Sequence, residues 1–381
     1  MVKSILVTST ELMMIQFLVP HIIHLSQNGF EVEIACSNVG GRIDEVREKL
    51  KDWTKAIHVV RLHRSPANID NVNGYKDMRR IIDRGNYDII WTNEPVMGVV
   101  TRLAAQKARK SGTKVLYMTH GFHFYDGAPR LNWMLYYPIE KMMASRADVI
   151  CTINREDYRR AQLFNTNRVE YIHGIGINTD RLTPKGSQGN IREELGLNAE
   201  DFLVLSVGEL NVNKNQQVIL RAIAKLNDKN IHYILCGKGD QREFLEKLAE
   251  ELGIRERVHF LGYRRDVVDI CSQADIFAFP SIREGLGLAP LEAMYAGLPL
   301  ITSRSRGPID FMIDGKTGYM ADANDENGFA KGIEAFVTDS EKRSIMGQYN
   351  KKVVIPYLVN NVKAEILSLM CSLKEEENER L

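Results

Sequence analysis

The sequence lacks long hydrophobic runs and closely spaced cysteines. None of its 381 residues lie in a run that approaches the roughly 18 consecutive apolar residues of a membrane-spanning helix. The apolar run at the N-terminus is too short for a signal peptide. The five cysteines are scattered without a C-x-x-C pair, and Cys36, Cys151 and Cys236 are predicted to be buried thiols in or near strands. These absences favour a cytoplasmic globular protein, in which any contact with the inner face of the cell membrane is peripheral.

An excess of charge of one sign is also absent from the chain as a whole. The formal net charge is +1, but residues 1–185 contain 26 Lys and Arg against 19 Asp and Glu, whereas residues 186–381 contain 24 against 30. A basic first half suits an anionic membrane surface or a phosphorylated acceptor. A modest imbalance with no partner explains the counts equally well. We expect no nucleic-acid partner.

A regular alternation of strand-like and helix-like segments fills the chain instead. Helical patterns such as 96–110 and 241–252 separate short apolar runs, and this alternation predicts an α/β protein with parallel, doubly wound sheets. The expected strands are 5–9, 30–35, 57–61, 88–92, 114–119, 148–153, 202–207, 231–236, 258–261, 275–279 and 299–302.

A polar stretch at 183–190 interrupts this alternation and marks a domain boundary. The sequence therefore predicts a first Rossmann-like domain over 1–185 and a second over 186–352. A C-terminal helix is expected within 353–381.

The segment from Pro280 to Pro299, PSIREGLGLAPLEAMYAGLP, is the most informative in the chain. An apolar run of strand length ends at its first proline, a glycine loop follows, and Pro290 suits the first turn of a helix. Glu284 is then expected in the loop and Glu292 in the first helical turn, beside the carboxyl end of a strand, where α/β sheets bind ligands. Two carboxylates beside free amides suit a nucleotide sugar. Because the helix dipole alone also favours acids there, the spacing by itself is weak.

The whole segment resembles the E-x7-E signature of the retaining family 4 glycosyltransferases. Their GT-B fold consists of two Rossmann-like domains that face each other across a cleft, and the last helix crosses back to the first domain. The resemblance covers nearly the whole chain and is strongest over 200–320. It implies a UDP-sugar as co-substrate, no cofactor and no metal ion. The chain also contains no D-x-D motif, the usual diphosphate–metal clamp of the other main transferase fold.

By this resemblance the E-x7-E segment holds the donor. Glu292 accepts hydrogen bonds from the ribose hydroxyls, and Glu284 meets sugar hydroxyls near the reacting centre. The loop amides that cap the phosphates belong to Gly285, Leu286, Gly287 and Leu288.

A second donor loop begins at Gly208 and resembles the family's G-R-L-x-x-x-K motif. Lys214 occupies the lysine position, where a point charge binds the diphosphate. A solvated lysine is the structural alternative. Glu209 stands where the family has arginine, so either another cation such as Arg283 or Arg304 compensates, or Glu209 turns away.

Two further loops resemble donor contacts of the family. Gly237 and Gly239 form a G-x-G after a strand, which is either a nucleotide loop or simply a tight turn. Tyr263 and Arg264 follow the next strand and are candidates for contact with uracil.

The acceptor side is expected in the first half, where an aromatic segment follows the 114–119 strand. His120 matches the family histidine that approaches the donor sugar, and His123 and Tyr125 are acceptor candidates, although a structural histidine is the alternative for both histidines. The helix over 131–140 is expected to be mostly buried, with a membrane interface as the alternative for its aromatic residues. The Gly-Gly turn that the family has near its N-terminus is replaced here by Thr8–Leu12.

The aromatic segment looks most like that of bacterial capsule and exopolysaccharide transferases. The implied reaction moves a hexose or N-acetylhexosamine from a UDP-sugar to a polyprenyl-diphosphate-linked saccharide with retention, and His120, Lys214 and Glu284 are the expected catalytic residues. A non-catalytic subunit that binds a nucleotide sugar or lipid diphosphate is one alternative, because Glu209 departs from the motif. An isomerase resembling UDP-N-acetylglucosamine 2-epimerase is another, which the long E-x7-E string disfavours.

Overall fold

Two α/β units make up the protein. The computed structural model describes residues 3–10, 12–39, 41, 43–182 and 190–378. Unit 1 combines the chain up to Gly176 with the chain from Val359 onward, and unit 2 runs from Ile177 to Leu358. The predicted boundary near residue 185 lies outside the described residues, and the division comes earlier in the chain. The C-terminal segment likewise separates at Val359 rather than at residue 353.

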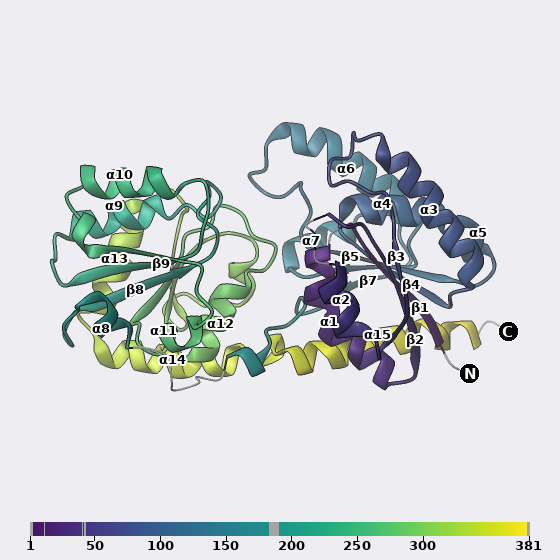
Figure 1. Ribbon diagram of the computed structural model, residues 1–381. Coiled ribbons are helices and arrows are strands. Elements are labelled where there is room, and N and C mark those ends of the chain that lie inside the picture. The colour runs from purple at the N-terminus through teal and green to yellow at the C-terminus, as the bar shows by residue number, and fades with distance from the viewer. Residues whose placement is uncertain (1–2, 11, 40, 42, 183–189, 379–381) are drawn as a thin grey trace. The chain divides into compact units, whose positions relative to one another are not determined.

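The sheet of unit 1 has seven strands in the order β3-β2-β1-β4-β5-β6-β7, and every pairing is parallel. Helices cover both of its faces (Figure 1). The strands are β1 (Lys3–Ser9), β2 (Phe30–Cys36), β3 (Thr54–Val59), β4 (Ile89–Asn93), β5 (Lys114–Thr119), β6 (Val149–Thr152) and β7 (Val169–Tyr171). The helices are α1 (Leu12–Gln27), α2 (Ile43–Leu50), α3 (Asp70–Gly85), α4 (Pro95–Ala104), α5 (Gln106–Lys110), α6 (Arg130–Ala144), α7 (Arg155–Ala161) and α15 (Val359–Asn378).

Unit 2 has a six-stranded parallel sheet in the order β10-β9-β8-β11-β12-β13. Its strands are β8 (Phe202–Val207), β9 (Ile231–Cys236), β10 (Val258–Gly262), β11 (Ile276–Phe279), β12 (Leu300–Ser303) and β13 (Gly318–Ala321). Its helices are α8 (Ile191–Leu195), α9 (Gln217–Leu226), α10 (Arg242–Glu251), α11 (Val267–Cys271), α12 (Leu288–Ala296), α13 (Glu326–Val337) and α14 (Ser340–Val353). Short 3₁₀ turns are η1 (Thr179–Arg181), η2 (Arg255–Arg257), η3 (Pro308–Asp310) and η4 (Ile355–Tyr357).

The burial of the central strands explains why their sequences read as continuous apolar runs. Strands such as β4 and β11 are buried along their whole length, as expected for parallel strands covered by helices on both faces. The α/β prediction is therefore confirmed, although the short strands β7 and β13 were not predicted. Cys36, Cys151 and Cys236 are buried free thiols, as expected.

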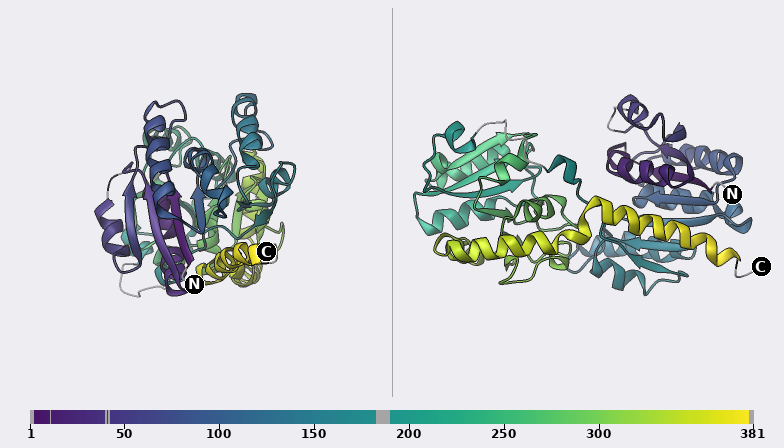
Figure 2. Two further views of the ribbon diagram at one scale, coloured as in Figure 1. Left: turned by 90° about the vertical axis from the view of Figure 1, so that its right-hand side faces the viewer. Right: turned by 90° about the horizontal axis from the view of Figure 1, so that it is seen from below.

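The last helix, α15, packs against α1 in unit 1, and the two lie side by side in Figure 1. Figure 2 shows α15 in yellow from two further directions. Two polar contacts attach it: His173 Nδ1 lies 2.6 Å from Glu365 Oε1, and Arg168 Nη1 donates to Ser372 Oγ at 3.0 Å. Helix α15 thus belongs to the unit that the first part of the described chain forms.

Candidate active site

In unit 2 the strand order reverses direction between β8 and β11. These two strands are neighbours in the sheet, whereas β9 and β12 continue outward on opposite sides. Two loops therefore leave the same edge at the carboxyl ends of β8 and β11, the position where open α/β sheets bind their ligands. The loop after β8 contains Lys214, and the loop after β11 contains Glu284.

Lys214 and Glu284 meet at this edge. Lys214 Nζ lies 2.5 Å from Glu284 Oε1, and both side chains are largely shielded from solvent. The ammonium also lies 4.9 Å from the centre of the Phe279 ring at the end of β11. A cation and a carboxylate that were predicted separately, from two motifs, are therefore direct partners.

Further hydrogen bonds hold the two loops in this arrangement. Asn213 Nδ2 donates to the carbonyl of Arg283 at 2.9 Å, and the amide of Arg283 donates back to Asn213 Oδ1 at 3.1 Å. Buried Arg306 donates from Nε to the carbonyl of Glu284 at 3.1 Å. Arg306 was not predicted, since it follows the next strand, β12, and no motif pointed to it.

Glu209, which replaces the family arginine, is exposed and turns to its own loop. Its Oε2 accepts a hydrogen bond from Asn211 Nδ2 at 2.9 Å. Arg304, one of the two suggested substitutes, is directed elsewhere: its Nη2 donates to the carbonyl of Met320 at 3.2 Å. Glu209 therefore hydrogen-bonds within its own loop, and the cation that takes the place of the family arginine stays a prediction.

The predicted glycines let two of the loops expected to bind the donor pack backbone to backbone. A Cβ on Gly237 would lie 1.8 Å from the carbonyl oxygen of Gly208, and a Cβ on Gly239 would lie 2.0 Å from that of Leu210. Gly208 lies close to the stem of Lys214. The G-x-G is thus required by loop packing, whether or not it also touches a nucleotide.

Glu292 lies further into its helix than predicted. Helix α12 begins at Leu288, so Glu292 is its fifth residue and lies just beyond the first turn. The helix starts before Pro290 because Gly287 adopts a φ of 92° at the N-cap, which lets the chain turn early. Leu286 is buried, and Gly285 precedes it in the loop. The amides at the start of α12 lack intrahelical acceptors and face outward from the helix end.

In unit 1 the equivalent reversal lies between β1 and β4. His120 follows the next strand, β5, and its Nε2 lies 3.0 Å from Asn93 Oδ1 at the end of β4. Because Asn93 Nδ2 donates to the carbonyl of Thr8, Oδ1 is the acceptor and His120 Nε2 carries the proton. Burial lowers the pKa of His120 to about 4, so the ring is neutral near neutral pH. Its Nδ1 is then a hydrogen-bond acceptor.

His123 and Tyr125 extend from the same segment as His120. The His123 ring centroid lies 4.7 Å from that of Tyr136 in α6, and the two rings are tilted by 31°. In the same segment, Phe122 and Phe124 are buried and anchor it in an aromatic cluster. His123 and Tyr125 are both partly exposed, and their proposed contact with an acceptor stays a prediction.

Comparison with known proteins gives the family. The model for Glycosyltransferase Family 4 matches residues 21–181, and the model for Glycosyl transferases group 1 matches residues 187–353. A glycosyltransferase-family protein named EpsD from Bacillus subtilis (strain 168) is 37% identical over 347 residues, which cover 90% of this chain and 89% of EpsD. The chain belongs to the family 4 glycosyltransferases.

Two further likenesses agree with this assignment. An Escherichia coli protein named UDP-Gal:alpha-D-GlcNAc-diphosphoundecaprenol alpha-1,3-galactosyltransferase is 25% identical over 342 residues, covering 87% of this chain and 86% of its own. The crystal structure of Anabaena Alr3699/HepE in complex with UDP and glucose has a TM-score of 0.79 at 18% identity, covering 97% of this chain and 100% of that one. The predicted GT-B fold and the predicted family of exopolysaccharide-type transferases are confirmed.

Glu94, which was not predicted, is a further candidate site residue in unit 1. It follows β4 with a φ of 66°, an unusual backbone for a residue with a side chain, and is the N-cap of α4. Its carboxylate accepts hydrogen bonds from Ser9 Oγ and from the amide of Thr10 at 2.9 Å. Burial raises the pKa of the Glu94 carboxyl, and these hydrogen bonds oppose the rise. A glutamate between a strand end and Pro95 was the available signal, because proline favours the first helical position.

The Thr8–Leu12 segment, which replaces the family's glycine turn, thus binds a carboxylate of the protein itself. The amide of Thr10 and the hydroxyl of Ser9 are both engaged by Glu94. An acceptor phosphate at this turn would have to compete with that carboxylate.

The two candidates for uracil contact differ in their surroundings. Tyr263 is exposed, whereas the Arg264 guanidinium pairs with Asp266 at 2.6 Å and with Glu194 at 2.8 Å. Those hydrogen bonds raise the pKa of Arg264 above its ordinary value. Tyr263 is therefore the more accessible of the two side chains, and both stay predictions.

Two other features are absent from the described residues. No group of three or more His, Cys, Asp or Glu side chains in this part of the chain is placed to hold a metal ion. Within the same residues, no helix combines the length and apolar character needed to cross a membrane.

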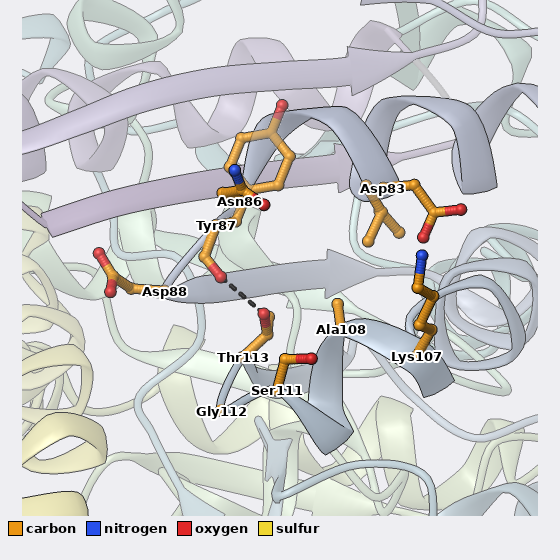
Figure 3. Close-up of a pocket in the computed structure, with 10 residues that line it drawn as sticks. Asp83, Asn86, Tyr87, Asp88, Lys107, Ala108, Ser111, Gly112 and Thr113 are labelled. Carbon is orange, nitrogen blue, oxygen red and sulfur yellow. Dashed lines mark hydrogen bonds between the residues drawn. The ribbon is translucent and has the colours of Figure 1, made fainter.

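A polar pocket of about 250 Å³ lies at the opposite, amino-terminal edge of the sheet of unit 1. In Figure 3, Asp83 of α3 and Lys107 of α5 point toward one another across it. Thr113 donates from its hydroxyl to the carbonyl of Tyr87 at 2.7 Å, which joins the starts of β4 and β5. None of the predicted site residues lines this pocket, so it is separate from the candidate active site.

Proposed function

We propose that this transferase moves a hexose or N-acetylhexosamine from a UDP-sugar to a polyprenyl-diphosphate-linked saccharide, with retention of configuration and without a metal ion. The contact between Lys214 Nζ and Glu284 Oε1, at the edge of the sheet where ligands bind, is the observation that carries this proposal. The names of the Escherichia coli relative and of the Anabaena complexes support the donor and the lipid-linked acceptor.

A UDP-sugar offers a better partner to each member of the pair. Its diphosphate is a stronger attraction for the Lys214 ammonium than a single carboxylate is, and its sugar hydroxyls donate hydrogen bonds that Glu284 can accept. The donor would therefore exchange one ion pair for two sets of contacts. Glu292 would accept hydrogen bonds from the ribose hydroxyls.

The reaction itself breaks the bond between the anomeric carbon and the diphosphate oxygen. Negative charge grows on the leaving UDP, where Lys214 and the first amides of α12 stabilise it. The acceptor hydroxyl attacks the same face of the sugar, and its proton passes to the departing phosphate oxygen. The protein mainly positions the substrates and stabilises this charge.

His120 contributes as a neutral group in this scheme. With its pKa near 4, the ring is not a cation, and Nδ1 would accept a hydrogen bond from a sugar hydroxyl. We place the acceptor saccharide near His123, Tyr125 and Glu94. These positions follow from the acceptor role of the first domain in this family.

Release of UDP from a panel of UDP-sugars, with and without membrane extract from a polysaccharide-producing bacterium, tests the proposal. Release from one donor only when extract is present, and unaffected by EDTA, is the expected result. Release of UDP at the same rate with and without the extract would contradict the proposal of a lipid-linked acceptor. UDP binding without release from any donor would favour a binding subunit, the alternative that Glu209 keeps open.

A further inference from the structure

Helix α6 exposes an apolar face. Five of its large apolar side chains are exposed, from 41% for Ile139 to 73% for Met134. Among the described residues, no other helix has more than two such side chains. Their spacing along α6 is that of one helical face, which we name the α6 apolar face. It consists of Leu131, Met134, Leu135, Ile139 and Met142.

The opposite side of α6 is packed in the ordinary way. Trp133, Tyr136 and Tyr137 join the aromatic cluster under the helix, and Met143 is buried. The expectation of a mostly buried helix is therefore wrong for one face, although core packing holds for the aromatics. Because the helix is fixed by its inner side, the exposure of its outer side is a stable feature of the fold. Contiguous exposed apolar side chains mark an interaction surface.

The exposed charged residues of α6 itself have one sign. Arg130 and Lys141 on the helix are exposed, and Arg146 follows it. Glu140 is the only acidic residue in α6, and it is buried on the inner side, where its Oε2 accepts from Arg102 Nη2 at 2.8 Å.

The wider sequence has the same bias. Residues 101–150 contain eight Lys and Arg against three Asp and Glu. All three acids are held in ion pairs: Asp126 with Arg160, Glu140 with Arg102 and Asp148 with Arg109. The α6 apolar face is bordered by cations, and the nearby acids in the sequence are paired. Such a face is complementary to a surface with an anionic outer layer over an apolar interior.

We propose that the α6 apolar face docks on an anionic lipid bilayer. Leu131, Met134 and Met142 would enter the boundary between headgroups and acyl chains, and Arg130 and Lys141 would meet the anionic headgroups. The inference deepens the proposed function, since a lipid-linked acceptor has to be reached at such a surface. Its test uses neither donor nor acceptor, so the two proposals can fail separately.

Sedimentation with vesicles provides the test. The full chain is mixed with vesicles of phosphatidylcholine alone, or of phosphatidylcholine with phosphatidylglycerol, and the bound fraction is measured at low and high salt. The test variant is Met134→Glu/Met142→Glu. The matched control is Ile69→Glu/Ile345→Glu, which adds the same charge at two equally exposed apolar side chains outside α6. Thermal melting checks that both variants fold.

We expect the wild type and the control to bind the anionic vesicles, with binding weakened by salt, and the α6 variant to partition at least about tenfold less. Equal loss in the control, or equal binding to both kinds of vesicle, would overturn the proposal. Analytical ultracentrifugation tests whether a second copy of the chain binds the α6 apolar face instead. A wild-type dimer that Met134→Glu/Met142→Glu dissociates, together with no vesicle binding, would assign the face to a second copy of the chain.

Discussion

Lys214 and Glu284 lie 70 positions apart in the sequence, and the fold makes them neighbours. Each neutralises the other while no ligand separates them. A substitution that removes the charge of Glu284 therefore frees Lys214 for a diphosphate but also removes an acceptor for sugar hydroxyls. Binding of the nucleotide and turnover should respond differently to the same change.

Glu284→Gln should leave UDP binding largely intact and lower turnover at least about tenfold, because only the sugar loses a charged acceptor. Calorimetry of UDP and the rate of UDP release measure the two effects. Glu209→Gln is the matched control, since it removes an exposed carboxylate from the neighbouring loop. Near-normal turnover in Glu284→Gln would remove Glu284 from the reacting centre.

Glu94→Gln tests the buried carboxyl of unit 1. A carboxyl whose pKa is raised in the folded state binds its proton more tightly there than in the unfolded chain. Its contribution to stability is therefore fully present below the unfolded pKa of 4.5 and is lost as the pH rises through the higher folded pKa. We expect the amide to raise the melting temperature relative to wild type near neutral pH, with a smaller gain in acid. A gain that does not change with pH would contradict this account.

Helix α6 shows how one buried ion pair fixes the orientation of a whole helix. Arg102 of α4 and Glu140 of α6 form a fully shielded pair, and the hydroxyl of Tyr117 in β5 donates to the second oxygen of Glu140 at 2.8 Å. Because the only acid of α6 must reach this partner, the apolar side chains on the opposite side face outward.

Arg102→Met should lower the free energy of unfolding by about 3 to 5 kcal/mol, because it leaves Glu140 buried without its cation. The double variant Arg102→Met/Glu140→Gln should recover part of this loss. Urea denaturation of the two variants and the wild type measures both values. If the double variant is no more stable than the single one, an unpaired charge is not the cause of the loss.

Helix α1 has a pH-sensitive contact with the segment just before Gly176, where the first part of unit 1 ends. His21 is buried, and its Nε2 lies 2.8 Å from the carbonyl of Ile175. Burial lowers its pKa from 6.5 to about 4, so the ring is neutral in the folded state. As the pH falls from 6.5 toward 4, His21 is protonated in the unfolded chain but not in the folded protein, and the free energy of unfolding therefore decreases.

His21→Gln should flatten this pH dependence by about 3 kcal/mol, since a neutral amide keeps a donor for Ile175 and does not titrate. The free energy of unfolding, followed across the interval from pH 6.5 to pH 4, measures the change in slope. His63→Gln, at an exposed histidine, is the control. An unchanged slope in His21→Gln would show that His21 does not dominate the acid response.

The secondary structure could be predicted from local patterns where strands are buried and helices amphipathic. The predicted strands 202–207 and 231–236 coincide with β8 and β9, whereas the short strands β7 and β13 were missed. Three- and four-residue strands at a sheet edge contain too few residues to show a period. The early start of α12 was missed because glycine can adopt many backbone conformations, and the sequence does not show which one Gly287 adopts.

At the scale of the whole molecule, unit 2 is one continuous stretch, whereas unit 1 combines two separate segments of the described chain. In α15 the side chains of Val362, Ile366 and Met370 are buried, and the helix contacts α1. Unit 1 therefore depends on a segment that lies beyond all of unit 2 in the sequence.

Ile366→Ala should destabilise unit 1 by about 2 to 5 kcal/mol, through lost burial and the cavity that remains. Hydrogen exchange read by mass spectrometry should show faster exchange in α1 and little change in unit 2. The reverse pattern is expected for Ile333→Ala, a buried isoleucine of α13 in unit 2. Equal acceleration in both units after either change would mean that they unfold as one.

The sequence by itself determined the class of this protein. Alternating apolar and polar segments predicted parallel α/β sheets, and the E-x7-E string with Lys214 predicted a family 4 glycosyltransferase. Both predictions rest on local sequence patterns, because the residues that specify a helix, a strand or a short loop motif are neighbours in the sequence.

Only the tertiary structure decided which side chains meet. Lys214 contacts Glu284, and Glu94 binds Ser9 and Thr10, although these residues are distant in the chain. Which face of α6 is exposed likewise depends on how the helix packs. The strand order and the packing of each helix set these contacts, and neither is visible in a local pattern.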